Sequence, residues 1–347
     1  MMNSAQKRSV VIWLGIVCMM IFSMVIIGGV TRLTHSGLSI VEWKPLMGAI
    51  PPLNEEAWNE TFEKYKQYPE YKIMNRLMDL ADFKYIFYWE YFHRLIGRLV
   101  GVVFLLPFLL FYFKKYFDTR LAARLFIGFM LGGLQGLLGW FMVKSGLVND
   151  PSVSHYRLAA HLSLAFAIAA YLFWILLDIA YEGDPAGKPH RRFKQSLLLT
   201  AAICLQIVYG AFTAGKKAGF GYNTFPMMDD SWIPDAVFAV QPAWLNFFET
   251  NAAIQFTHRM IAWLLVIFIP VFLLRIRKEL GSRQKTAMNL LLAALGLQFT
   301  LGVLTILFIG SHEVVLPSIH QAGAFVLFST AIFFNHCLSR NEGKNAG

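Results

Sequence analysis

Eight apolar stretches, each about as long as a bilayer is thick, constrain the fold of this chain more than any other feature. A helix needs about 20 consecutive apolar residues to cross a bilayer, and a spanning helix satisfies all of its own backbone hydrogen bonds. We therefore predict an all-α membrane protein with eight transmembrane helices. The predicted spans are 10–30, 91–113, 121–143, 158–181, 197–215, 254–274, 287–309 and 319–338.

The composition and the placement of basic residues support this prediction and orient the chain. Only 15% of the 347 residues are charged, whereas soluble domains carry roughly 25%. Lys and Arg, which give a net charge of +10, gather before the first span and after the second, fourth and sixth. Cytoplasmic segments carry such an excess, so we expect both termini in the cytoplasm and the chain in a bacterial inner membrane. A lipid bilayer is then the surrounding partner, and the distribution argues against nucleic acid.

The second half of the chain repeats the first. Four spans return a chain to its starting side, so both halves share one orientation. We expect two four-helix bundles related by a pseudo-twofold axis along the membrane normal. The predicted halves are residues 1–190 and 191–347. The matching positions include His93 with His258, Arg94 with Arg259, and His161 with His320.

A Leu-Gln-x-x-x-Gly pattern recurs inside the third, fifth and seventh predicted spans. Its glycines allow close approach of helix backbones, and its glutamines are placed to bridge helices. We interpret the pattern as an element of packing. The glutamines are Gln135, Gln206 and Gln298, and the glycines are Gly139, Gly210 and Gly302.

Four histidines inside predicted spans are the strongest candidates for function, because ionisable side chains are costly in a membrane. Each half offers two, from different helices and in the first turns of their spans, near the outer face. Zinc requires three or four ligands, whereas two imidazoles suit the two faces of a haem. The alternative for any one of them is a hydrogen-bonded structural histidine. The predicted haem ligands are His93 and His161 in the first half and His258 and His320 in the second.

Arginines accompany the first histidine of each half. We expect these basic side chains to pair with haem propionates, and the alternative is snorkelling toward the membrane interface. The arginines are Arg94 and Arg98 in the first half and Arg259 in the second.

One carboxyl distinguishes the two halves. Glu90 stands three residues before His93, on the same helical face, and Gln255 takes this place before His258. This asymmetry predicts chemistry in the first half and electron storage or transfer in the second. The alternative is that Glu90 only starts a helix, where the dipole favours a carboxylate.

Five runs of the sequence are long enough to compare with known families. They are 31–45, 66–72 and 90–98 in the first half and 219–228 and 320–324 in the second. Together they resemble the haem A synthase family, membrane enzymes that convert haem O to haem A for terminal oxidases. The resemblance covers nearly the whole chain.

The resemblance implies an oxidoreductase that oxidises a ring methyl of haem O to a formyl group through successive hydroxylations. It implies a haem b held by His258 and His320, and substrate haem O held by His93 and His161. It also implies that Glu90 takes part in the oxidation. Haem O synthase and terminal oxidase assembly factors are the expected partners, together with an electron donor of unspecified kind.

Cysteine placement narrows the resemblance. Some members of the family carry a cysteine pair in the outer loops, whereas Cys18, Cys204 and Cys337 all fall within predicted spans. The chain therefore resembles the branch shared by proteobacteria and mitochondria.

Two other classes of function fit four buried histidines. One is a di-haem b-type electron-transfer subunit with two permanent haems, and the other is a transporter or proton channel that binds no haem.

Overall fold

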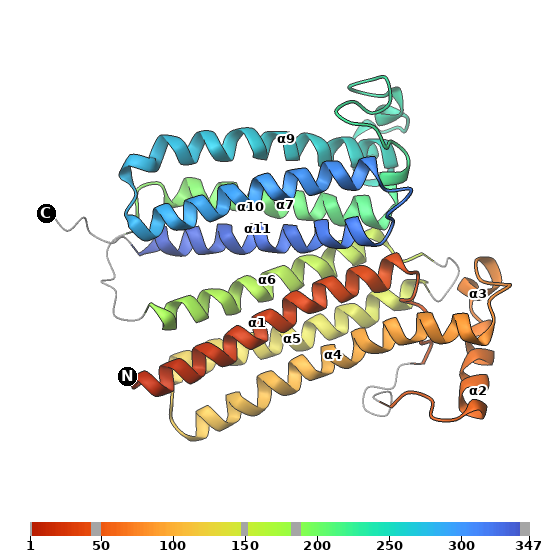
Figure 1. Cartoon of the computed structure of the whole chain (residues 1–347), viewed down its shortest axis with the longest axis horizontal. Helices are drawn as coiled ribbons and strands as arrows, with labels where there is room; N and C mark the ends of the chain where they lie inside the picture. Colours follow the sequence, from red (N-terminus) through yellow and green to blue (C-terminus); the bar gives the residue numbers. More distant parts are fainter. Residues whose placement is uncertain (1, 43–49, 147–151, 182–188, 341–347) are drawn as a thin grey trace, which may run out of the picture. The chain divides into compact units, whose positions relative to one another are not determined.

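The computed structural model of this chain describes residues 2–42, 50–146, 152–181 and 189–340. Among these residues, eight helices are long and apolar enough to cross a membrane, which confirms the predicted all-α class and the eight spans (Figure 1). The eight helices are α1 (Ser4–Leu33), α4 (Leu80–Phe113), α5 (Thr119–Gly146), α6 (His155–Ala180), α7 (Phe193–Gly215), α9 (Asn251–Ile276), α10 (Ser282–Leu307) and α11 (Val315–Ser339).

Helix α4 differs most from its predicted bounds, because it begins at Leu80 rather than at Tyr91. Asp79 caps it: its side chain accepts hydrogen bonds from the backbone N–H groups of Ala81 and Asp82. Such a cap starts a helix where hydropathy alone gives no signal. The sequence predicts His93 in the first turns of its helix. The structure shows instead that His93 lies well inside α4.

The chain divides into two compact units, which we describe separately. Unit 1 comprises residues 1–2 and 16–168, and unit 2 comprises residues 3–15 and 169–347. The division passes through α1 and α6. The two predicted halves, with their boundary after residue 190, and the pseudo-twofold relation between two bundles stay predictions.

Unit 1 carries a folded segment between α1 and α4. It contains α2 (Glu55–Lys66) and α3 (Pro69–Ile73), which lie at the beginning of α4 (Figure 1). The side chain of Asn54 accepts a hydrogen bond of 2.8 Å from Ala57 N and so caps the start of α2. Six aromatic side chains and one isoleucine join α2 to α4 in one buried cluster. Its members are Trp58, Phe62, Tyr65, Phe83, Ile86, Phe87 and Tyr91.

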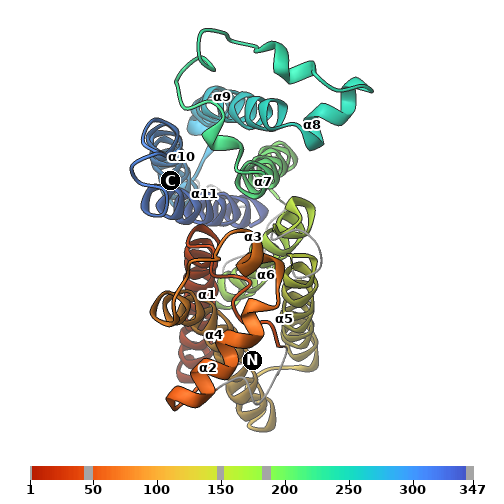
Figure 2. The same cartoon turned by 90° about the vertical axis from the view of Figure 1, so that its right-hand side faces the viewer.

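Unit 2 is built around four long helices. Helix α10 packs along α11, α7 packs along α9, and α11 also contacts α7. Figure 2 views these helices nearly end-on, with the connection from α7 to α9 extending beyond them. This connection contains η2 (Ala218–Phe220), η3 (Asp235–Phe238), η4 (Ala243–Leu245) and α8 (Asn246–Glu249).

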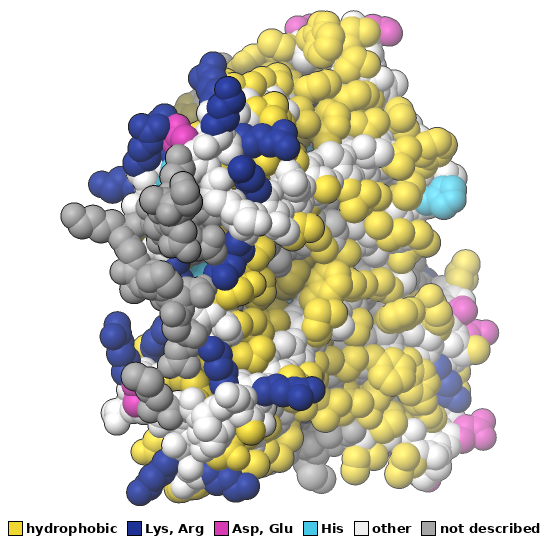
Figure 3. Space-filling model, turned by 60° about the vertical axis from the view of Figure 1, so that its left-hand side comes forward, with side chains coloured by type: hydrophobic (Ala, Val, Ile, Leu, Met, Phe, Trp, Pro, Cys, Tyr) yellow, Lys and Arg dark blue, Asp and Glu magenta, His cyan; other side chains and the backbone are white. Residues whose placement is uncertain are grey.

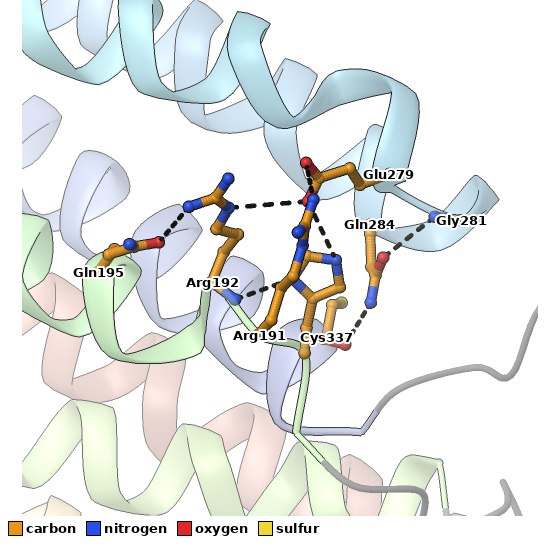
Figure 4. Close-up of polar contacts among 8 residues, drawn as sticks. Arg191, Arg192, Gln195, Glu279, Gly281, Gln284 and Cys337 are labelled. Carbon is orange, nitrogen blue, oxygen red and sulfur yellow. Dashed lines mark hydrogen bonds and ion pairs between the residues drawn. The ribbon is translucent and has the colours of Figure 1, made fainter.

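A polar cluster closes the other end of unit 2 (Figure 4). Glu279, between α9 and α10, accepts two hydrogen bonds from the guanidinium of Arg191, at 3.1 and 2.5 Å. On α10, Gln284 donates to the backbone carbonyl of Cys337 at 3.1 Å. These contacts fix the start of α7 to the α9–α10 connection and to the end of α11.

Figure 3 shows Lys and Arg side chains gathered along one margin of the visible face. Hydrophobic side chains cover most of the rest of this face.

Candidate functional site

In unit 2, two histidines face each other from α9 and α11. The ring centres of His258 and His320 are 6.5 Å apart, and the ring planes are at 87°. A metal–imidazole bond is about 2 Å long and the ring centre lies about 1 Å behind the nitrogen, so two axial imidazoles are expected with centres roughly 6 to 6.5 Å apart. The spacing therefore fits one haem iron between the two rings.

In unit 1, His93 on α4 and His161 on α6 lie close enough to interact electrostatically. Both side chains are partly buried, as are their counterparts in unit 2. In the described part of the chain, no three His, Cys, Asp or Glu side chains come together in an arrangement that could hold a metal ion. The candidate ligands therefore come as pairs, one pair in each unit.

Each of the four histidine rings lies against a glycine of the preceding long helix. A Cβ atom added to these glycines would lie between 2.7 and 3.2 Å from the ring Cε1 atom. Any larger residue would therefore displace the ring. All four glycines lie in the last two turns of their helices. The pairs are Gly28 with His93 at 2.7 Å, Gly139 with His161 at 3.0 Å, Gly210 with His258 at 3.2 Å, and Gly302 with His320 at 3.0 Å.

Three of the four rings also contact a glutamine that lies one turn before the glycine. This confirms that the glutamines of the Leu-Gln-x-x-x-Gly pattern bridge helices, but the sequence did not indicate that they bridge to the histidines. A signal was present, because glutamine and glycine are separated by four residues and so share a helical face. The Nε2 atoms of Gln135, Gln206 and Gln298 lie 3.3 Å from His161 Nε2, 3.4 Å from His258 Nε2 and 3.1 Å from His320 Nδ1, respectively.

Glu90 is buried on α4, with 3% of its surface exposed. One carboxylate oxygen, Oε2, accepts hydrogen bonds from Ser39 Oγ and Ile40 N, both at 2.7 Å. The other, Oε1, accepts one from Arg94 at 2.6 Å. The alternative that Glu90 starts a helix is wrong, since α4 begins at Leu80. Ser39 and Ile40 were not predicted as part of the site.

At the corresponding position in unit 2, the side chain is also hydrogen-bonded to the backbone, but the donor and the acceptor are exchanged. Gln255 donates from Nε2 to the carbonyl of Tyr222 at 2.7 Å, whereas Glu90 accepts from the N–H of Ile40. The repeat aligns Gly37 with Gly219, so Ile40 and Tyr222 occupy equivalent places. Each unit therefore holds the segment after its first long helix to the histidine-bearing helix, but only unit 1 uses a carboxylate.

The arginines that follow the histidines have different partners. Arg94 pairs with Glu90 and also donates to the carbonyl of Ile40 at 2.9 Å. Arg98 lies one turn further along α4 and is partly buried. Arg259 is 8% exposed. Its guanidinium donates to backbone carbonyls of the α7–α9 connection, those of Tyr222, Thr224 and Met227.

Comparison with known proteins decides the family. The model of the COX15-CtaA family, described as cytochrome oxidase assembly protein, matches residues 11–332. The haem A synthase of Nitrosospira multiformis is 48% identical over 340 residues, which cover 97% of this chain and 95% of the relative. This chain belongs to the haem A synthase family. The haem A synthase of Nitrosomonas eutropha is 45% identical over 95% of this chain and 94% of the relative.

Membership of the haem A synthase family confirms the resemblance predicted from the five sequence runs. The similarity also includes a plant protein. Haem A synthase COX15 of Arabidopsis thaliana is 44% identical over 96% of this chain and 75% of the relative. The runs lie mostly in the described structure; only residues 43–45 of the first fall outside it. The roles of the individual site residues stay predictions.

Proposed function

We propose that this chain is a haem A synthase that oxidises a ring methyl of haem O to a formyl group, giving haem A. One observation carries the proposal: two matching histidine pairs differ in having Glu90 beside one and Gln255 beside the other. A protein whose two haems only transfer electrons would not need a carboxylate beside just one of the two histidine pairs. Family membership supports haem O as the substrate.

The histidine pairs would hold the two haems. His258 and His320 would bind a resident haem b, which the spacing of 6.5 Å between their rings supports. His93 and His161 would bind the substrate. Haem iron supplies the oxidation chemistry that amino-acid side chains lack, through successive hydroxylations of the methyl group. The chain's own contribution is to ligate, orient and surround the two macrocycles.

Glu90 would act as a fixed negative charge. Both of its oxygens already accept hydrogen bonds, from Ser39, Ile40 and Arg94. A carboxylate held in this way is preorganised to stabilise positive charge that develops on a nearby carbon during oxidation. Its engagement on both oxygens favours this electrostatic role over the transport of protons.

The arginines would anchor the haem propionates. The guanidinium of Arg259 donates to three backbone carbonyl oxygens and also interacts electrostatically with Asp229. Its buried positive charge would favour an anionic propionate. Arg94 shares its charge with Glu90, and Arg98, on the next turn of α4, would complete the set in the first half.

The proposed location is a bacterial inner membrane with both termini in the cytoplasm. The connection between α4 and α5, the start of α7 and the connection between α9 and α10 carry the basic residues, as cytoplasmic segments do. Haem O synthase and terminal oxidase assembly factors are the proposed partners, which the assembly function named for the family supports.

The decisive experiment compares the haems extracted from membranes that contain haem O, with and without this protein. Formyl-bearing haem A, separated by chromatography, is expected only with the protein. Two bound haems with no haem A would instead indicate a di-haem electron-transfer subunit. A purified protein with no haem in its visible spectrum would indicate a transporter or channel.

The variant Glu90→Gln tests the carboxylate. Removing one preorganised electrostatic group costs roughly 10²- to 10³-fold in rate, so haem A formation should fall by about this factor while the haem b spectrum is kept. Glu70→Gln is the matched control, because Glu70 is another buried glutamate of the same unit and contacts neither histidine. Conversion at the parent rate in Glu90→Gln would remove Glu90 from the proposal.

A further inference from the structure

We infer that Gln135, Gln206 and Gln298 position three of the four haem-ligating histidines, and that Met24, at the fourth equivalent place, leaves His93 as the releasable ligand. The inference rests on the proposed function, since it assumes that the four histidines bind haem. It assigns unequal holding strength to the two haem sites from contacts of the chain itself.

The glutamine contacts follow one rule along the chain. Each glutamine lies one turn before the glycine that seats a histidine, and its amide reaches that same ring. Gln135 also donates to the backbone carbonyl of His161 at 3.0 Å, which ties the amide to the helix that carries the ring. The contacts therefore involve α5 with α6, α7 with α9, and α10 with α11.

The amide oxygens of these glutamines point to a ligand-holding role. Among the described residues, no hydrogen-bond partner reaches the buried Oε1 atoms of Gln135, Gln206 and Gln298. A histidine bound to a metal by one ring nitrogen carries its proton on the other, and that N–H needs an acceptor. A half-turn of the Gln206 and Gln298 amides would bring Oε1 to the place where Nε2 now contacts the ring. The Gln135 amide keeps its orientation, because its Nε2 also donates to the His161 carbonyl. The glutamines are thus positioning residues that act through the histidines.

Met24 breaks the rule at His93. The repeat aligns Gly28-x-x-Thr31 with Gly210-x-x-Thr213, so Met24 takes the place of Gln206. Its Cε atom lies 3.6 Å from a Cβ built on Gly97, one turn after His93. A thioether is only a weak hydrogen-bond acceptor. Among the described residues, the Nδ1 atoms of His93, His161 and His258 are all buried without a hydrogen-bond partner. His93 differs from the other two in that they contact a glutamine through Nε2.

This asymmetry matches the different fates of the two haems. In the second half, both histidines have a glutamine, as a resident haem b requires. In the first half, His161 has one and His93 has none. A substrate must enter and a product must leave, so one weakly held ligand permits exchange while the other keeps the macrocycle oriented. The site that has Glu90 is therefore also the site from which haem is released.

The variant Met24→Gln supplies the missing amide. We expect it to slow the release of haem O from the purified full-length protein to excess apomyoglobin by roughly tenfold, since such hydrogen-bond partners change metal affinity about 10- to 100-fold. Met24→Leu is the matched control and should release haem O at the parent rate. An unchanged release rate in Met24→Gln would overturn the assignment of His93 as the releasable ligand.

Two opposite substitutions test the glutamines of the second half. Gln206→Leu should raise the midpoint potential of haem b and speed its loss about tenfold, because an imidazole without an acceptor is a weaker donor to iron. Gln206→Glu should lower the potential, so the test survives if one variant folds poorly. Gln284→Leu is the control, because Gln284 is a buried glutamine whose amide donates to Cys337.

The outcomes separate this inference from the proposed function. Unshifted potentials in both Gln206 variants would overturn the positioning role, even if the parent protein converts haem O. Shifted potentials with no haem A from the parent protein would sustain the positioning role and overturn the synthase assignment. A parent protein that binds no haem would overturn both.

Discussion

Single residues decide how each histidine is seated. The four rings lie against glycines on neighbouring helices, so close that an added methyl group would require the ring to shift. Glu90 and Gln255 also differ by a single atom. Replacing one carboxylate oxygen with an amide nitrogen reverses the direction of the hydrogen bond to the backbone at equivalent places. Small changes in side chains thus distinguish two otherwise parallel sites.

The glycine seat predicts a specific defect in Gly302→Ala. Its new Cβ would lie 3.0 Å from His320 Cε1, and such overpacking costs about 1–3 kcal/mol. Haem b content per protein, measured by the pyridine haemochrome spectrum, should fall. Gly296→Ala, on the same helix with nothing within 4 Å of its added Cβ, should keep full haem content. Equal haem content in the two variants would contradict the seat.

Among the elements, the segment of α2 and α3 shows how the outer part of unit 1 is held. Its aromatic side chains pack on α4, where Tyr65 and Phe83 stack with ring centres 5.1 Å apart. The Tyr65 hydroxyl donates to Glu70 at 2.9 Å and accepts from Asn75 at 2.7 Å. Burial raises the pKa of Glu70 from 4.5 to about 7, and the negative charge of Glu90 adds to the shift.

The raised pKa of Glu70 predicts that this segment loosens as pH rises. In the unfolded segment the carboxyl releases its proton near pH 4.5, whereas in the folded one it does so near pH 7. The stabilisation is therefore complete below pH 4.5, is lost between pH 4.5 and 7, and changes no further above. Amide hydrogen exchange in residues 55–75, corrected for intrinsic rates, should show falling protection over this range. Glu70→Gln should abolish the dependence, and a slope that persists in this variant would assign it to another group.

The sequence predicted the elements well and the contacts of the site less well. Spans follow from runs of apolar residues, so all eight were found. The largest error is at the start of α4, because Asp79 caps a polar turn there. The histidine pairs followed from the repeat. Ser39 and Ile40 lie far from Glu90 in sequence, and no local pattern marks them. The glutamine contacts were missed because a packing role explained the same spacing.

On the scale of the whole molecule, the repeat has a shorter period than the two halves. A helix bearing glycine precedes a helix bearing histidine four times, as α1 with α4, α5 with α6, α7 with α9, and α10 with α11. Each glycine lies near the end of one helix, and its histidine lies on the helix that follows. Since successive spans reverse direction, this arrangement brings both histidines of a unit to the side of the membrane opposite the basic segments.

The orientation of the whole chain predicts the accessibility of single cysteines. The native Cys18, Cys204 and Cys337 form no disulfide within the described residues and lie in helices α1, α7 and α11, so a variant with all three changed to alanine should keep haem A formation. In that background, Asn59→Cys on α2 and Ser282→Cys at the start of α10 are both at exposed positions. A membrane-impermeant maleimide applied to intact spheroplasts should label Asn59→Cys, because the proposed orientation places α2 outside. It should label Ser282→Cys only after permeabilisation, because the α9–α10 connection carries basic residues and faces the cytoplasm in the proposed orientation. The reverse pattern would invert the topology and place Glu90 and the histidines near the cytoplasmic face.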